Sequence, residues 1–157
     1  LCGRAHGFMP VVVHAMEEEK FDEWLASKKE EIALQKAAAQ EALSQDLSMD
    51  ELMSQGESIY TARCAVCHQA NGEGIPGAFP AIKGSPIATG PISEHIDVIV
   101  NGRPGTAMQS FSNQLSDKEI AAVITYQRNA WGNDTGDTVQ ASDVNAFKAQ
   151  GSAKEEI

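Results

Sequence analysis

Cys64-Ala65-Val66-Cys67-His68 is the stretch that decides how the rest of this 157-residue chain is interpreted. Its pattern, C-x-x-C-H, places two thiols three positions apart with an imidazole directly after the second. At this spacing each thiol can add to one vinyl group on the edge of a porphyrin, and the histidine then faces the iron. This is a c-type haem attachment signature, so we expect one covalent haem c, held by Cys64 and Cys67, with His68 as an axial ligand.

Other functions of a Cys-Cys-His group fit the sequence less well. A structural zinc site needs a second pair of ligands, and His6, His14 and His95 show no ligand spacing among them. A thioredoxin-like redox pair needs a βαβ context, whereas this pair ends a predicted helix and enters a loop. A chance match of the bare motif is the remaining alternative. We place His95 at the surface or at a helix cap and assign it no role.

A haem iron bound by one histidine has a sixth position, and five methionines could fill it: Met9, Met16, Met49, Met53 and Met108. The first two lie in an earlier unit, and the next two lie on a predicted helix, where methionine is usually core filler. Met108 lies in a loop of Gly, Ser and Thr, far enough along the chain to reach the opposite haem face. We therefore favour Met108, whose thioether would raise the reduction potential and suit an electron carrier.

The sequence around the motif predicts a mainly helical domain. Two capping boxes, Ser48 to Glu51 and Ser116 to Glu119, begin helices that should end near residues 63 and 131. Between them, residues 69–91 hold five glycines and four prolines, which predicts a long wrapping loop. A short helix follows, with Ser93 as its N-cap and Gly102 as its end. Residues 133–157 are expected to form a polar tail, with one weak turn of helix after Ser142.

The formal net charge of −10 is concentrated ahead of this domain. Residues 15–51 hold eleven acidic and four basic side chains, whereas residues 64–131 hold five and four. An acidic chain without a cluster of Lys and Arg argues against nucleic acid as a partner. Residues 17–43 contain no Gly or Pro and predict a solvated helical spacer. Its start should dock through a short apolar stripe formed by Phe21, Trp24, Leu25 and Ile32.

Residues 48–132 resemble a class I cytochrome c. In that family the first and last helices cross at a small residue and an aromatic, and Gly56, Tyr60 and Tyr126 match those positions. Pro80 matches the family proline whose carbonyl accepts the Nδ1–H of the ligand histidine, with a simple loop kink as the alternative. The resemblance implies a mainly α, class I cytochrome c fold wrapped round the haem, with Tyr60 and Pro80 in the surroundings of the cofactor.

The start of the chain resembles the end of the copper (CuA) domain of cytochrome c oxidase subunit II. There a cysteine, a histidine four residues on and a methionine three beyond that bind copper, and Cys2, His6 and Met9 match them. Residues 11–13 are all valine and resemble the end of that cupredoxin domain. The family's other bridging cysteine would precede Cys2 by four residues and is not in this chain, so we expect CuA only in the intact parent and no copper centre here.

These resemblances divide the chain into the end of an incomplete CuA domain (1–14), an acidic helical linker (15–47), a cytochrome c domain (48–132) and the tail (133–157). No apolar run approaches the roughly 20 residues that cross a bilayer, and the chain begins without a methionine. We therefore expect it to start inside a longer protein, whose missing N-terminal part would hold the membrane segments.

The function implied is electron relay in a respiratory chain, on the periplasmic side of the bacterial inner membrane. The haem would accept electrons from a donor cytochrome or a quinol-oxidising complex and pass them to CuA and the oxygen-reducing subunit. The partners would be the other oxidase subunits. The parent complex would be an oxidoreductase, whereas this part would be an electron carrier without catalytic residues. The alternatives are a free-standing periplasmic monohaem cytochrome c and a five-coordinate haem sensor that binds a gas.

Overall fold

The computed structural model describes residues 12–152, which divide into two units at Gln40 and Glu41. The expected spacer helix is α1 (Glu18–Ser44), which begins in the first unit and ends at the start of the second. The rings of Phe21 and Trp24 pack against each other with centroids 5.8 Å apart, yet both side chains stay about half exposed. Ile32 of the expected stripe is also half exposed, and Leu25 is partly buried. The predicted cupredoxin end lies mostly in residues 1–11, outside the described part.

Two helices that are far apart in the sequence frame the second unit. They are α2 (Met49–Arg63) and α6 (Asp117–Asn129), and both begin at the predicted capping boxes. In each box the N-cap hydroxyl accepts a hydrogen bond from the backbone N–H three residues on, and the glutamate there accepts one from the N-cap N–H. The two predicted helix starts are confirmed.

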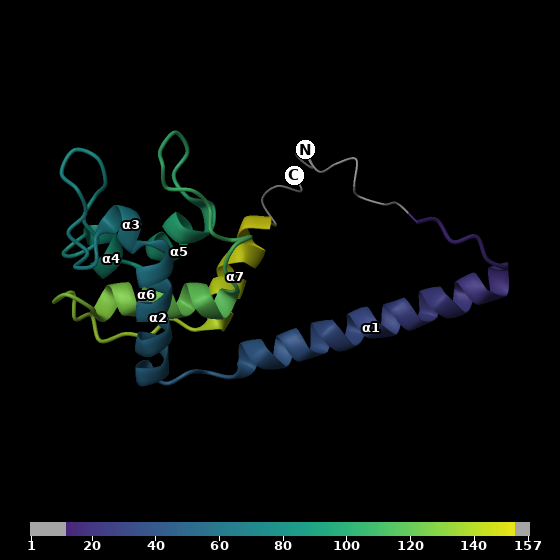
Figure 1. Cartoon of the computed structure of the whole chain (residues 1–157). Helices are drawn as coiled ribbons and strands as arrows, with labels where there is room; N and C mark the ends of the chain where they lie inside the picture. Colours follow the sequence, from purple (N-terminus) through teal and green to yellow (C-terminus); the bar gives the residue numbers. More distant parts are fainter. Residues whose placement is uncertain (1–11, 153–157) are drawn as a thin grey trace. The chain divides into compact units, whose positions relative to one another are not determined.

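α2 crosses α6 at Gly56, as Figure 1 shows. A Cβ on Gly56 would lie 2.2 Å from the carbonyl oxygen of Ala122, so only a glycine lets the two backbones approach this closely. One turn later the rings of Tyr60 and Tyr126 meet with centroids 5.6 Å apart. This crossing is the centre of the core, whose largest fully buried side chains include Leu52, Tyr60, Ile120, Val123 and Ile124.

Three short helices occupy the sequence between the two long ones: α3 (Ala65–His68), α4 (Pro86–Thr89) and α5 (Ile92–Asn101). α5 ends at Gly102 as predicted, but its N-cap is Pro91 rather than Ser93. The wrapping loop before α4 contains an isolated β-bridge between Ile75 and Phe79.

Residues 139–152 are more ordered than the polar tail with one weak helical turn that the sequence predicts. α7 (Ala141–Ser152) packs against α6, and Val139 and Val144 are completely buried. The side chain of Gln140 bonds both the N–H and the carbonyl of Leu47, at 3.1 and 2.9 Å, which ties this segment to the start of the domain. The few apolar residues here fall at positions that face α6, a pattern that the polar average composition conceals. Within residues 12–152, no helix is long and apolar enough to span a membrane.

Candidate functional site

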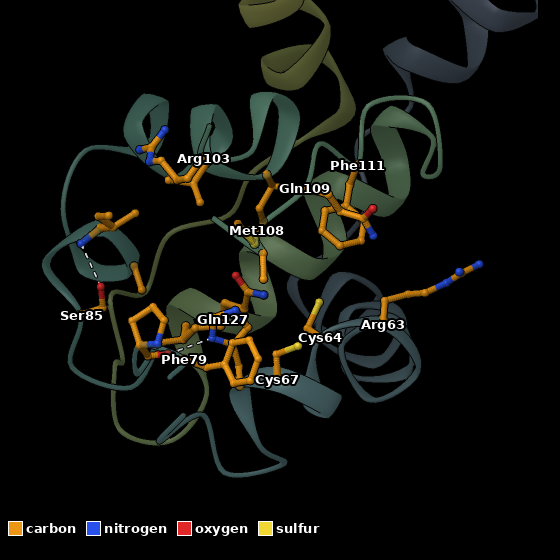
Figure 2. A pocket seen from close by; sticks show the side chains of 18 of the residues that line it. Arg63, Cys64, Cys67, Phe79, Ser85, Arg103, Met108, Gln109, Phe111 and Gln127 are labelled. Carbon is orange, nitrogen blue, oxygen red and sulfur yellow. Dashed lines mark hydrogen bonds between the residues drawn. The ribbon is translucent and has the colours of Figure 1, made fainter. Parts of the chain in front are cut away.

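The second unit contains a mostly apolar cavity of about 450 Å³. One part, which we call the histidine wall, is lined by side chains of residues 63–82. Another, the methionine wall, is lined by side chains of residues 98–111. Figure 2 shows Met108 at the upper side of this cavity, with Cys67 and Phe79 at its lower side. α4, the start of α5 and the face of α6 that carries Val123 and Gln127 complete the lining.

The histidine wall is built by one helical turn. α2 ends at Cys64, whose carbonyl accepts hydrogen bonds from the backbone N–H groups of Cys67 and His68, at 3.1 and 2.9 Å. This turn brings both thiols and the imidazole to the cavity, and neither thiol is in a disulfide. Burial, with a smaller contribution from Cys67, raises the pKa of the Cys64 thiol to about 11, so it is a neutral thiol at pH 7.

The imidazole of His68 is oriented by the wrapping loop. Its Nδ1–H donates to the carbonyl oxygen of Pro80 at 2.9 Å, which leaves the lone pair of Nε2 free to bind a metal. Gly74 makes this approach possible, because its φ is +65° and a Cβ there would lie 2.6 Å from the Pro80 oxygen. The geometry matches the contact that the family resemblance implied for Pro80.

The methionine wall depends on a loop folded back onto α5. Gly102 has a φ of +71°, and the next backbone N–H, that of Arg103, donates to the carbonyl of Met108 at 2.8 Å. The N–H of Phe111 donates to the carbonyl of Ile99 at 3.0 Å and closes the loop. Met108 is thereby held half-buried against the core, with its side chain lining the cavity.

The other candidate residues lie elsewhere. Met49 and Met53 are on α2 and do not line the cavity, and Met16 is exposed. Met9, like Cys2 and His6, lies outside the described residues. Tyr60 also does not line the cavity. Its hydroxyl donates to the carbonyl of Gln69 at 2.7 Å, so it supports the chain just after the motif from within the core.

The placement of His95 at the surface is wrong. Its side chain is 4% exposed, lines the cavity, and its Nε2 lies 2.7 Å from Oε1 of Gln127. Burial lowers the pKa of His95 to about 4, so it is neutral at pH 7. The sequence contains a signal for this position, because His95 precedes the buried Ile99 by four residues and so shares the apolar face of α5.

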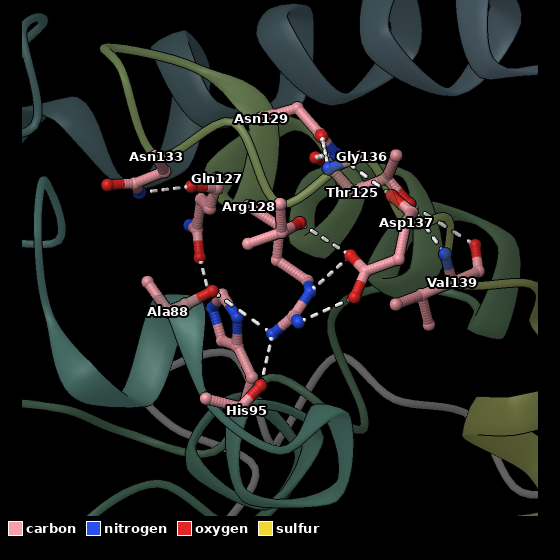
Figure 3. A network of polar contacts seen from close by, with 12 residues as sticks. Ala88, His95, Thr125, Gln127, Arg128, Asn129, Asn133, Gly136, Asp137 and Val139 are labelled. Carbon is pink, nitrogen blue, oxygen red and sulfur yellow. Dashed lines mark hydrogen bonds and ion pairs between the residues drawn. The ribbon is translucent and has the colours of Figure 1, made fainter.

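A buried arginine lies beside this pair, as Figure 3 shows. Arg128 is 3% exposed; its guanidinium bonds both carboxylate oxygens of Asp137 at 2.7 Å and the carbonyls of Ala88 and Gly90 at 3.0 Å. The hydrogen bonds from Arg128 hold the pKa of Asp137 below its usual range. Arg128 therefore connects the segment after α6 with the end of α4. No pattern in the sequence predicts these contacts.

The donor set fits a c-type haem. The cavity offers two thiols, an imidazole with a free Nε2 and a thioether in a mostly apolar lining. Within residues 12–152 no group of three or more His, Cys, Asp or Glu side chains could hold a metal ion. Fold and site together define a c-type haem domain of the class I cytochrome c fold.

The comparisons with known proteins agree with this class. A family model described as cytochrome c oxidase, cbb3-type, subunit III matches residues 51–126. Cytochrome c-552 of Thermus thermophilus is 39% identical over 90 residues, which cover 49% of this chain and 68% of that protein. The chain belongs to the cytochrome c family.

Longer relatives share only this part of their sequence. The cytochrome c subunit of the quinone-type alcohol dehydrogenase of Gluconobacter oxydans is 34% identical over 106 residues, 61% of this chain and 22% of that subunit. The cbb3-type oxidase subunit CcoP of Azospirillum brasilense is 31% identical over 83 residues, 49% of this chain and 28% of that subunit. The chain thus spans less than a quarter of the length of the dehydrogenase subunit. The domain it contains is an electron-transfer module that carries covalent haem c.

Proposed function

We propose that the second unit binds one haem through thioethers at Cys64 and Cys67, with His68 and Met108 as axial ligands of the iron. The observation that carries this proposal is that the C-x-x-C-H turn and Met108 line the same cavity. Once bound, the haem supplies a one-electron couple between ferric and ferrous iron. The protein accepts an electron from one partner and passes it to another.

The surrounding residues set the properties of this couple. The Pro80 carbonyl fixes the tautomer of His68 and makes its Nε2 a better ligand. The soft sulfur of Met108 stabilises ferrous iron and raises the reduction potential. The apolar lining keeps water away from the haem, which favours electron transfer with little rearrangement.

The test is Met108→Ala in the haem-loaded chain. The substitution should abolish the weak red-edge absorption band of a methionine-bound ferric haem and sharply lower the reduction potential, while covalent haem remains. Met49→Ala is the matched control, because Met49 is on α2 and does not line the cavity. An unchanged spectrum in Met108→Ala would remove Met108 from the site. It would leave haem attachment to be judged separately by mass spectrometry.

For the intact protein, we propose the C-terminal part of an oxidase subunit II in which a cytochrome c domain follows the CuA domain. The support is the likeness of Cys2, His6 and Met9 to half of the CuA ligand set, and the helical linker α1 that connects this stretch to the haem domain. In this arrangement the haem relays electrons to CuA on the periplasmic side of the membrane, with the other oxidase subunits and a donor cytochrome or quinol-oxidising complex as partners.

The sequence upstream of Leu1 tests this assignment. A cysteine four residues before Cys2, and two apolar runs of about 20 residues further back, would support it, and their absence would end it. The present chain alone should bind no copper, because it holds only part of the ligand set.

A free-standing electron shuttle is the second candidate. It is favoured by the match to cytochrome c-552, of which the chain covers 68%. A free-standing shuttle does not explain α1 or its half-exposed Phe21 and Trp24. Co-purification of the natural protein with oxidase or dehydrogenase subunits separates the two, because a shuttle is recovered alone.

A further inference from the structure

Haem attachment does not explain the polar pair His95 and Gln127. Both side chains line a mostly apolar cavity, and both are almost completely buried, at 4% and 3% exposure. A polar group in such a place is costly unless it has a partner. The two side chains share one hydrogen bond, between His95 Nε2 and Gln127 Oε1, at 2.7 Å.

The surroundings of His95 decide which of its nitrogens carries the proton. Figure 3 shows the imidazole between the amide of Gln127 and the guanidinium of Arg128. Burial keeps the ring neutral by lowering its pKa, and the positive charge of Arg128 opposes a second proton. Nδ1 is buried and has no hydrogen-bond partner among the described residues. The single proton therefore belongs on Nε2, where the oxygen of Gln127 accepts it, and Nδ1 keeps only a lone pair.

This protonation state fixes the orientation of the Gln127 amide. Because Oε1 accepts from His95, the NH₂ group takes the other position on the amide. Among the described residues the Gln127 side chain bonds through Oε1, and no hydrogen bond from its Nε2 is present. In Figure 2 Gln127 points into the cavity together with Met108. The cavity thus contains a fixed N–H donor that no carbonyl of the described residues satisfies.

We propose that Gln127, oriented by His95, donates a hydrogen bond to an electron-rich acceptor at the haem and raises its reduction potential. This inference rests on the proposed haem site. The acceptor is the thioether sulfur of Met108 or a carboxylate of the haem. In either case the positive end of a fixed N–H dipole faces the place where the electron arrives, in a medium of low dielectric constant. His95 acts only through Gln127 and is a positioning residue.

Gln127→Met tests the donor, because it keeps the length of the side chain and removes the N–H. We expect the equilibrium constant for haem reduction to fall about tenfold, which equals about 59 mV for one electron. The direction of the change in reduction potential distinguishes a hydrogen-bond donor from a polar filler. If Gln127 were only a polar filler, an apolar replacement would disfavour the charged ferric haem and raise the potential. Gln55→Met, on the exposed face of α2, is the matched control and should leave the potential unchanged.

His95→Leu tests the positioning role. Without the imidazole the Gln127 amide can rotate, so the potential should fall by part of the Gln127→Met effect. In the double variant, His95→Leu should add nothing to Gln127→Met. Full additivity of the two shifts would overturn the positioning role. A potential that is unchanged or raised in Gln127→Met would overturn the proposal itself.

Two further readouts keep the proposal testable if a variant folds poorly. In the unmodified, haem-loaded chain, NMR should show the Gln127 amide protons strongly shifted between the ferric and ferrous states. Amide protons that do not respond to oxidation state would contradict the inference. In Gln127→Met, a shifted red-edge band identifies Met108 sulfur as the acceptor, whereas an unshifted band with a lowered potential identifies a haem carboxylate. Absence of covalent haem in the unmodified chain would instead defeat the proposed function.

Discussion

The histidine wall and the methionine wall of the cavity differ in how much of the chain each one needs. Cys64, Cys67 and His68 are brought together by a single helical turn, held by hydrogen bonds to the Cys64 carbonyl. The methionine wall has no such local motif. Met108 is held by backbone bonds to Arg103 and, through Phe111, to α5, and α5 in turn packs on α6.

The difference separates two properties of the site. Attachment of the haem depends on a turn that a short peptide can specify. In the proposed site, ligation of the sixth position by Met108 would depend on the tertiary packing of α5, α6 and the loop 102–111, and so would the polarity around it. Substitutions in the histidine wall should therefore decide whether haem is present. Substitutions in the methionine wall should change the stability of the domain and the properties of the haem, with the haem still attached.

The largest effect is expected from Cys64→Ser combined with Cys67→Ser. Without the two thiols no thioether can form, so covalent haem should be lost completely. The measurement is the intact mass of the purified chain, together with haem staining of a denaturing gel. Cys2→Ser is the matched control, since Cys2 is outside the C-x-x-C-H motif, and it should retain full haem loading. Loss of haem in the control would contradict the assignment.

The next effect concerns His95 at acidic pH. Its pKa is about 4 in the folded chain, because burial disfavours the charged ring, against an ordinary value of 6.5 that applies to the unfolded chain. As pH falls from 6.5 to 4, the unfolded state takes up the proton first, so the free energy of unfolding should fall, by about 3 kcal/mol in all. Above pH 6.5 this contribution is constant.

Denaturant unfolding at several pH values measures this loss. His95→Leu should flatten the dependence between pH 6.5 and 4, whereas His14→Leu, at an exposed position of the first unit, should leave it unchanged. Below pH 4, loss of the ion pair between Arg128 and Asp137 adds to the acid sensitivity. The pKa of Asp137 is lowered in the folded chain, so its stabilising effect disappears as pH falls through that pKa.

Local features of both walls could be predicted from the sequence. The C-x-x-C-H spacing and the two capping boxes are local patterns, and the turn, α2 and the start of α6 follow from them. Gly102 as the end of α5 and Met108 on the cavity lining could also be predicted. Glycine commonly ends a helix, and a methionine in a polar loop is not expected there for packing alone.

The remaining features depend on contacts between distant parts of the chain. His95 meets Gln127 across 32 positions, and Arg128 meets the carbonyl of Ala88 across 40. No local pattern encodes these pairs. The sequence predicts only a weak turn where α7 forms, because this segment is mostly polar and few of its residues, such as Val139, Val144 and Phe147, contribute to the core. The spacing of these apolar residues fits a helix that packs on one side, but the polar average composition of the segment favours a solvated tail.

A smaller effect is expected from Gly102→Ala in the methionine wall. The left-handed φ of +71° disfavours alanine, and the new Cβ would lie 2.6 Å from the carbonyl oxygen of Met108. We expect a loss of about 2 kcal/mol in the free energy of unfolding, with a weakened red-edge band and haem still attached. Gly105→Ala is a close control, since its φ is +79° but no atom lies within 4 Å of its Cβ. Equal effects in both variants would show that backbone strain alone, and not displacement of Met108, is responsible.

The smallest effect concerns the ion pair between Arg103 and Asp97, which joins the methionine loop to α5 at 2.6 Å. Both side chains are at least about a third exposed, so Arg103→Gln should lower the free energy of unfolding by only about 0.5 kcal/mol, and less at high salt. The hydrogen bond from Arg103 holds the pKa of Asp97 below its usual value, so that pKa should rise in the variant, as NMR titration can measure. Because the backbone bond from Arg103 to Met108 does not need the side chain, the red-edge band should persist. If the band were lost, the position of Met108 would depend on a surface charge, and the methionine wall would be held by electrostatics instead of by the packing of its backbone against α5.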